Sequence, residues 1–309
     1  MMLKKTSLVL AIFVFLVAGT YGALVWHNNR SALPPASLEV TASWEKSVSW
    51  LLQNRDTVLR DNNPILWWMI GEGAKATGDH RLQTLYAAFR ARYDIENATS
   101  IWQTFFEPAR YWGSNFPRES FAIYADYQQY FLFGLTCGKQ LAAEPIIDAQ
   151  HSPDFCWHAH PFSPACMTHQ LMGYRFLQRT GCDRVDGLDT KIAALQSSIE
   201  RQLTWDPRVV DVYLQRILML VDSDAASRIK PRWLERALAA QLDDGSWSNF
   251  QPLLPIGGGR YIGFNERLLG IGRVQGNLHA TAQGLLLLSL LQQRDAQQRA
   301  TALSGQRRE

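Results

Sequence analysis

Two segments decide the fold: Arg236 to Trp247 (RALAAQLDDGSW) and Asn277 to Ala282 (NLHATA). The first ends a predicted helix that begins at Pro231, carries charge on one face and stops near Leu242. The second begins a helix that Asn277 caps and that stays strongly apolar through Leu291. A helix charged on one face lies at a surface, whereas one that is apolar all round is buried. We therefore expect an outer helix, a long connection and an inner helix.

The same alternation recurs along the chain. Helices predicted to begin near residues 63, 119, 167, 207 and 277 are apolar or aromatic on most sides, and those near 43, 80, 188 and 230 carry charge on one face. Convincing strand alternation is scarce. The pattern predicts an all-α fold, an α/α toroid of about five helical hairpins over residues 40–295, with the apolar helices inside.

The predicted connections alternate in length as well. Those from an inner to an outer helix are short, whereas several from an outer to an inner helix are long: roughly residues 93–118, 149–166 and 243–277. In such a ring all outer-to-inner loops leave the same end. Because long loops without regular structure are usually functional, we expect the mouth of a site at that end.

The segment Gln241-x3-Gly245-x-Trp247 resembles the core of the QW motif of the terpene cyclases, members of the α/α-toroid superfamily together with the protein prenyltransferases. The resemblance implies that the glutamine and the tryptophan tie an outer helix to the following turn. It implies neither family's reaction. The stretch Asp222 to Ala225 lacks the last aspartate of the cyclases' acid motif, and the cysteines that a prenyltransferase zinc site would need are expected in disulfides.

The N-terminus predicts export. Residues 1–5 are basic, and residues 6–26 contain no charged residue, which is enough to span the bilayer core of about 30 Å. The sequence therefore predicts a cytoplasmic stub, a transmembrane anchor over 6–26 in the inner membrane, and a domain on the periplasmic side. A signal sequence cleaved near Val17-Ala18-Gly19 is the alternative. Residues 27–39 are expected to form a linker and residues 296–309 a polar tail.

Four cysteines, Cys137, Cys156, Cys166 and Cys182, cluster in the exported part. An even, clustered set favours two disulfides, for which three pairings are possible. In the predicted ring Cys137 and Cys182 follow neighbouring inner helices at the closed end, whereas Cys156 and Cys166 lie in one loop at the mouth. A helix of about 20 Å separates the ends, and a disulfide needs Cα atoms within about 7 Å. The predicted pairs are Cys137–Cys182 and Cys156–Cys166.

The composition excludes several classes of protein. The 309 residues carry 31 Lys and Arg against 28 Asp and Glu, and their apolar residues are plentiful but dispersed. This excludes a disordered chain and a polytopic membrane protein. The small basic excess gives no support to nucleic-acid binding. The cluster Gly257 to Gly259 lacks the strand-to-helix setting of a phosphate loop, and no cofactor is predicted.

Two histidines, His169 and His279, each lie near the start of a predicted inner helix. In the ring both would point toward the mouth, as would Asp211 and Trp68. Imidazole titrates near neutral pH and can act as a general acid or base. The candidate catalytic groups are therefore His169, His279, Asp211 and Tyr261 of the last long loop. The alternative for each histidine is a ring satisfied within the core.

Aromatic and charged residues are interleaved in the loop over residues 93–118. Sugar rings stack on aromatic faces, and arginine steadies a carboxylate or a developing charge. The candidate substrate-binding residues are Trp68, Arg110, Tyr111, Trp112 and Arg260. The alternative is that these loop residues pack onto the barrel.

A metal site is only weakly indicated. His158 and His160 are two residues apart and point the same way in an extended chain, so that with His169 they could ligate a metal ion. The alternative is a disulfide-closed loop with exposed histidines. His-x-His without a carboxylate at fixed spacing does not by itself predict a metal site.

Two functions follow as hypotheses. The first is a membrane-anchored, extracytoplasmic enzyme that acts on a glycan as a hydrolase or a lyase. The alternative is a non-catalytic binding or scaffolding module of the envelope. The partners expected are the membrane, through the N-terminal helix, and a glycan or another envelope ligand. Convergent titratable groups at the mouth favour the enzyme, and aromatic groups alone favour the binding module.

Overall fold

A computed structural model describes residues 2–97, 100–152, 154–156 and 163–306. The α-helices are α1 Met2–Asn29, α2 Ser37–Gln53, α3 Arg55–Val58, α4 Pro64–Thr77, α5 His80–Arg92, α6 Arg118–Phe121, α7 Asp126–Thr136, α8 Lys139–Ala142, α9 Pro145–Gln150, α10 Cys166–Thr180, α11 Leu188–Trp205, α12 Asp211–Asp222, α13 Pro231–Ala239 and α14 Leu278–Gln306. The 3-10 helices are η1 Ile101–Phe105, η2 Pro108–Tyr111 and η3 Ala226–Arg228, and the strands are β1 Gln251–Gly257, β2 Arg260–Phe264 and β3 Leu269–Gly272. The predicted, predominantly helical class is confirmed.

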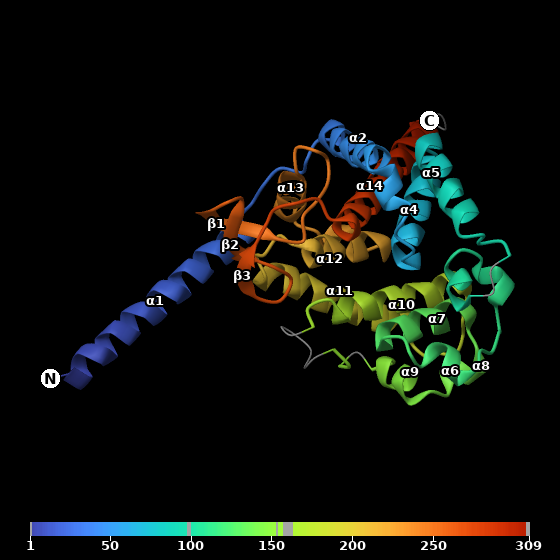
Figure 1. Ribbon diagram of the computed structural model, residues 1–309, viewed down its shortest axis with the longest axis horizontal. Helices are drawn as coiled ribbons and strands as arrows, with labels where there is room; N and C mark the ends of the chain where they lie inside the picture. Colours follow the sequence, from blue (N-terminus) through green and yellow to red (C-terminus); the bar gives the residue numbers. More distant parts are fainter. Residues whose placement is uncertain (1, 98–99, 153, 157–162, 307–309) are drawn as a thin grey trace.

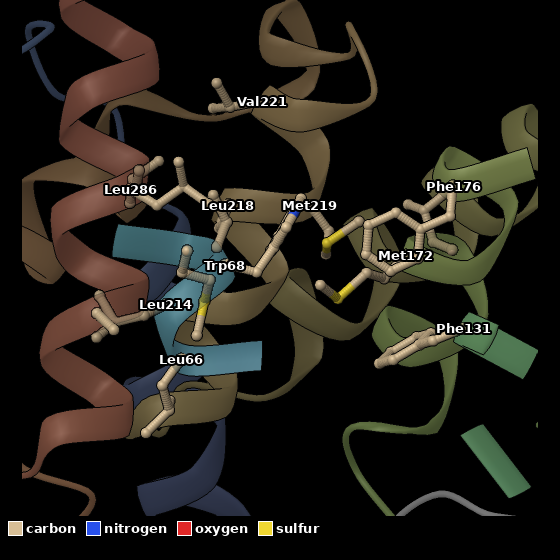
Figure 2. Close-up of a cluster of buried hydrophobic side chains, with 14 of the residues drawn as sticks. Leu66, Trp68, Phe131, Met172, Phe176, Leu214, Leu218, Met219, Val221 and Leu286 are labelled. Carbon is tan, nitrogen blue, oxygen red and sulfur yellow. The ribbon is translucent and has the colours of Figure 1, made fainter. Parts of the chain in front are cut away.

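The helices that the sequence marks as apolar surround one core. α4 packs against α14, α14 against α12, α12 against α10, and α10 against α7, while η1 contacts both α7 and α4. Side chains from these helices meet in the cluster of Figure 2, where Trp68 of α4, Leu286 of α14, Met219 of α12 and Met172 of α10 lie close together. The amphipathic helices α2, α5, α11 and α13 pack on this core from outside (Figure 1).

Local signals place several of these helices where the sequence predicts them. The Asn63 side chain accepts a hydrogen bond from the Ile65 amide, with Pro64 at the first helical position of α4. Gly78 ends that helix in the left-handed conformation, and Asp79 caps α5 by accepting from the Leu82 amide. Gly181 ends α10 in the same left-handed way.

The turn after α13 joins the two ends of the domain. The Gln241 side-chain amide donates to the carbonyl of Ser43 in α2 at 2.8 Å and to that of Gly245 at 2.9 Å. The Trp247 indole is buried and donates to the carbonyl of Ala237 in α13. The resemblance to the QW motif implies hydrogen bonds of this kind between the outer helix and the turn. Here Gln241 also connects the turn to α2, the first helix of the domain.

The connection over residues 243–277 is not the irregular loop that we expected. It contains an antiparallel sheet in the order β1-β2-β3, and the glycine cluster is the turn between β1 and β2. Gly257, Gly258 and Gly259 all have positive φ, which side chains other than glycine rarely adopt. The strands lack polar–apolar alternation because one face carries glycines and the other aliphatic side chains.

Three predicted boundaries differ from the structure. The helix expected over 119–136 is interrupted after α6, and α7 begins only at Asp126. The expected polar tail continues α14 as far as Gln306, because its residues favour helix without needing burial. The expected linker begins as helix, since α1 runs to Asn29.

The first helix, α1, extends away from the other elements, and its C-terminal end contacts α11 and α13 (Figure 1). The Tyr21 hydroxyl donates to the carbonyl of Trp205 at 2.6 Å, and the Asn28 amide donates to that of Leu203. A search of the described residues finds no helix with the length and apolar character that a membrane crossing needs. The transmembrane span predicted for residues 6–26 is therefore not supported.

Both disulfides have the pairing that the helix layout predicts. Cys137 pairs with Cys182, and Cys156 pairs with Cys166, each with a Cα–Cα distance of 5.6 Å. Cys137 follows α7, whereas Cys182 lies just beyond α10, so the first bond joins the C-terminal ends of two packed helices. The second bond closes the loop before α10 onto that helix's first residue.

Candidate functional site

A cavity of about 60 Å³ lies within the ring of contacts between α4, α10, α12 and α14. Its volume is enough for a few water molecules. Its lining combines polar groups, several of them near helix starts, with apolar side chains of the core: Asn63, Ile65, Trp68, Met69, Tyr127, His169, Met172, Gln215, Leu218, Met219, Asp222, His279, Gln283 and Leu286. The structure therefore brings the predicted residues His169, His279 and Trp68 to one cavity.

His169 of α10 is held between aromatic rings. It stacks on Tyr127 of α7 with ring centroids 4.1 Å apart and meets the ring of Phe131 edge-on. Burial, reinforced by the neighbouring His279, lowers the pKa of His169 to about 3, and Asp211 opposes the shift. His169 is therefore a neutral imidazole at physiological pH, able to donate one hydrogen bond and accept another.

His279 of α14 faces a carboxylate. Its Nδ1 atom lies 3.4 Å from Oδ2 of Asp211, the first residue of α12. The Asp211 side chain is mostly buried, whereas 39% of the His279 side chain is exposed. A carboxylate at one imidazole nitrogen favours the proton there and leaves the other nitrogen to act as a base. The distance exceeds an ordinary hydrogen bond, as catalytic pairs often do without substrate.

The cavity also contains an acceptor that lacks a partner. Gln283 is one helical turn after His279, and its Nε2 atom lies 3.4 Å from the His279 Nε2 atom. The Gln283 carbonyl oxygen is buried and forms no hydrogen bond within the described residues. Such a group in a polar cavity calls for a donor from water or from a ligand.

An open groove adjoins the cavity. Its volume is about 640 Å³, and it shares Tyr127 and His169 with the cavity, so these two rings separate the two spaces. Two of the long connections contribute to its lining: Phe155 and residues 163–166 come from one, and Glu266 with Arg267 from the other. Asp126 adds a carboxylate at the start of α7. The groove lies at the end where the sequence predicts the mouth.

Other predicted residues lie outside the cavity and the groove. Tyr261 and Arg260 are on β2, where Arg260 is exposed. Arg110 and Tyr111 are in η2, where the guanidinium pairs with Glu107 at 3.3 Å and lies over the tyrosine ring. Trp112 follows them and is 46% exposed. The described lining of both spaces includes none of the five, so their roles in substrate binding and catalysis stay predictions.

The metal hypothesis has no structural support. His158 and His160 lie outside the described residues. Within the part that the structure describes, no group of three or more His, Cys, Asp or Glu side chains is arranged to hold a metal ion. His169, the third expected ligand, stacks on Tyr127 instead.

Sequence reasoning missed Tyr127, Asn63 and Gln283. A positional signal could have found the first two, because each polar residue of the mouth lies at the N-terminal end of an inner helix. Asn63 caps α4, Tyr127 is the second residue of α7, and His169, Asp211 and His279 lie in the first turns of α10, α12 and α14. Gln283 lies one turn deeper in α14.

Comparison with family models, curated proteins and solved structures finds no match for this chain. The arrangement itself must therefore indicate what chemistry is possible. It combines a histidine–carboxylate pair, a neutral histidine and a tyrosine where an open groove meets a small cavity. Such a set suits proton transfer to and from a bound hydroxyl, ether oxygen or activated carbon.

Proposed function

We propose that this protein is an extracytoplasmic enzyme of α/α-toroid architecture that acts on a glycan by general acid–base catalysis, as a hydrolase or a lyase. The observation that carries the proposal is the His279–Asp211 pair beside His169 and Tyr127 at the junction of groove and cavity. Convergent titratable groups of this kind are more typical of a catalytic centre than of a passive binding surface.

Each group has a distinct role in this proposal. His279 takes a proton through the ring nitrogen that does not face Asp211, and the carboxylate stabilises the imidazolium that forms. His169 stays neutral because burial lowers its pKa to about 3, so it serves as a hydrogen-bond partner and not as a cation. The Tyr127 hydroxyl supplies a second polar contact at the entrance, where its pKa is raised by burial.

A glycan suits the groove better than a compact metabolite does. The groove is open, about 640 Å³ in volume, and carries the ring of Phe155 together with Asp126, Glu266 and Arg267. Sugar units present apolar ring faces and a rim of hydroxyls, and both find matching groups on such a surface. The cavity behind it has room only for water or one small substituent.

The toroid and the location are supported by separate observations. The sequence of contacts from α4 through α14, α12 and α10 to α7, with η1 contacting both α7 and α4, fits a closed ring of inner helices. Two disulfides fit an oxidising compartment such as the periplasm. The basic start and the uncharged stretch over residues 6–26 fit an export signal of the chain, and attachment to the inner membrane stays part of the proposal.

The test is an activity screen on the purified full chain with neutral and uronate-containing polysaccharides. New reducing ends report cleavage of either kind, whereas ultraviolet absorbance of an unsaturated sugar appears only with a lyase. The variant His279→Gln should lower the rate by about 10²- to 10⁴-fold, and His80→Gln, on the exposed start of α5, should leave it unchanged.

The alternative is a binding module of the envelope, and the small volume of the inner cavity favours it. It predicts glycan retention on an affinity gel with no product formed. It also predicts that His279→Gln alters affinity alone. That pattern across the whole panel would contradict the enzymatic proposal.

A further inference from the structure

One face of the three-stranded sheet is aliphatic and exposed. Leu254 of β1 pairs with Ile262 of β2, which pairs with Ile271 of β3, so the three side chains share one face. Leu269 lies two residues before Ile271 and shares that face. The exposed fractions are 61% for Leu254, 59% for Leu269 and 58% for Ile271. A contiguous aliphatic sheet face of this kind marks an interaction site.

The opposite face packs on the domain. A Cβ atom added to Gly263 or Gly272 would lie 2.6 or 2.7 Å from the ring of Phe250, which is therefore in direct contact with the glycine face. Phe250 is itself buried. The sheet is thus held by its glycine side, and the aliphatic side is directed away from the domain.

The apolar surface continues from the sheet to α1. Arg208 donates to the carbonyl of Glu266 in the β2–β3 turn and forms an ion pair with Asp206. The preceding residue, Trp205, accepts the hydrogen bond from Tyr21 of α1. Figure 1 shows the strands beside the C-terminal end of α1. Trp26 of α1 is 67% exposed, and Trp205 is 61% exposed.

Positive charge flanks this surface. Residues 251–273 contain three arginines, Arg260, Arg267 and Arg273, against one acid, Glu266. Arg267 pairs with Glu266 at 3.2 Å. Arg260 and Arg273 are exposed and form no ion pair with any residue that the structure describes. Two uncompensated guanidinium groups therefore border the aliphatic face.

We propose that the aliphatic sheet face binds the surface of a bilayer that contains anionic lipids, alongside the C-terminal half of α1. Leu254, Leu269 and Ile271 enter the boundary between headgroups and acyl chains, where Trp26 and Trp205 also reside. Arg260 and Arg273 contact lipid phosphates. This surface would hold the domain close to the membrane in a fixed orientation, a role separate from the catalytic proposal.

A lipid surface suits the face better than a second copy of the chain does. In a two-fold pair of sheet faces, Arg260 and Arg273 would meet their own equivalents, and like charges would repel. The continuity with α1 points the same way, because exposed α1 residues such as Phe15 and Leu16 are apolar and uncharged.

The test uses the full chain with one probe on the sheet. All four native cysteines are in disulfides, so a thiol introduced by Ile271→Cys can be labelled alone with a nitrobenzoxadiazole fluorophore. The matched control is Ile123→Cys, since Ile123 is 77% exposed in the turn between α6 and α7. Vesicles of phosphatidylcholine with phosphatidylglycerol should shift the emission of the sheet probe to the blue, and spin-labelled lipid should quench it. The control probe should keep its aqueous spectrum.

The arginines are tested in the same labelled chain. Replacing Arg260 and Arg273 by glutamine should raise the lipid concentration at half-maximal signal by about fivefold for each charge removed, and high salt should reduce that difference. An unchanged sheet probe with vesicles present would overturn the proposal. A blue shift without vesicles that grows with protein concentration would assign the face to a second copy instead. Equal signals on neutral vesicles would refute the anionic preference.

Discussion

Gly245 is a residue at which only glycine fits. Its φ is +93°, and an added Cβ atom would lie 2.2 Å from the carbonyl oxygen of Lys46 in α2. The turn therefore approaches the first helix of the domain more closely than any side chain would allow. The same approach lets Gln241 reach the Ser43 carbonyl. Gly245 of the Gln-x3-Gly-x-Trp segment therefore allows close packing between the turn after α13 and α2, the first helix of the domain.

Gly245→Ala should lower the free energy of unfolding by about 2–4 kcal/mol, since it adds a backbone clash to the strain of a positive φ. The matched control is Gly257→Ala, which has nearly the same φ of +92° but open space around the added atom. The control should cost about 1 kcal/mol. Urea denaturation of both variants measures the difference. Equal losses of unfolding free energy in the two variants would show that α2 can shift away from the turn at no cost, which would contradict this account.

Asp211 and His279 should act as one unit if the catalytic proposal is correct. Asp211→Asn removes the charge that holds the imidazole, and we expect a rate loss of about 10²-fold or more. The double variant with His279→Gln should be no slower than His279→Gln alone, because residues of one unit are not additive. Rates on the substrate found in the screen test this. Additive losses of rate in the double variant would show that Asp211 and His279 act independently.

At the scale of elements, capping residues made the helices predictable and packing made the sheet unpredictable. Asn63-Pro64, Gly78 and Gly181 mark helix ends by backbone chemistry that acts locally. In the sheet, β3 alternates glycine with aliphatic residues and β2 carries Gly263, because one face contacts Phe250. That contact joins residues that are separated in the sequence, and no local rule signals it.

The two disulfides should contribute unequally to stability. Their sequence separations are 45 for Cys137–Cys182 and 10 for Cys156–Cys166. Chain entropy then gives about 4 and about 2.7 kcal/mol, because a longer loop loses more freedom in the unfolded state. Replacing each pair by alanine should lower the free energy of unfolding in that order, by about 1 kcal/mol more for the first. Denaturation under non-reducing conditions measures both, and the reverse order would contradict this account.

For the whole molecule, the mouth of the site was predictable and its full lining was not. Alternating helix character placed His169, His279 and Asp211 at one end, because the starts of all inner helices share that end. The loop candidates Arg110, Tyr111 and Trp112 lie away from the cavity and the groove, since η2 forms its own contacts with Glu107 and Gln103. Which way a long loop turns depends on packing that composition does not specify.

Acid should destabilise the molecule through His169. Its pKa is about 6.5 in the unfolded chain and about 3 in the native state. Between these values the unfolded chain binds a proton that the native state does not, so stability is full above pH 6.5 and falls as the pH drops toward 3. The loss between pH 7 and pH 4.5 should be roughly 2.5 kcal/mol, since pH 4.5 is two units below the unfolded pKa and one unit corresponds to about 1.4 kcal/mol.

His169→Gln should flatten that dependence in urea denaturation at the two pH values. Part of the slope should remain, because burial also lowers the pKa of His151. Asp206 does not interfere: burial would raise its pKa, but hydrogen bonds from Arg208 and the charge of Arg216 lower it to about 2. The stability that the ionised Asp206 side chain contributes is therefore lost only below about pH 3.8. An unchanged slope in the variant would show that His169 is not the titrating group.

The last helix of the domain, α14, covers apolar surface of two of the first helices, α2 and α4. α14 packs against α2 and α4, and the Trp44 indole donates to the Ser289 hydroxyl across that contact at 2.9 Å. A ribosome makes α2 and α4 long before Ser289, so the faces that α14 covers lack their native partner while most of the chain is being synthesised. A polypeptide that must thread through a secretion pore has to stay unfolded until it has crossed. If the domain is exported as proposed, late closure by α14 suits that requirement, because the contacts of α14 with α2 and α4 form only after the C-terminal helix has emerged.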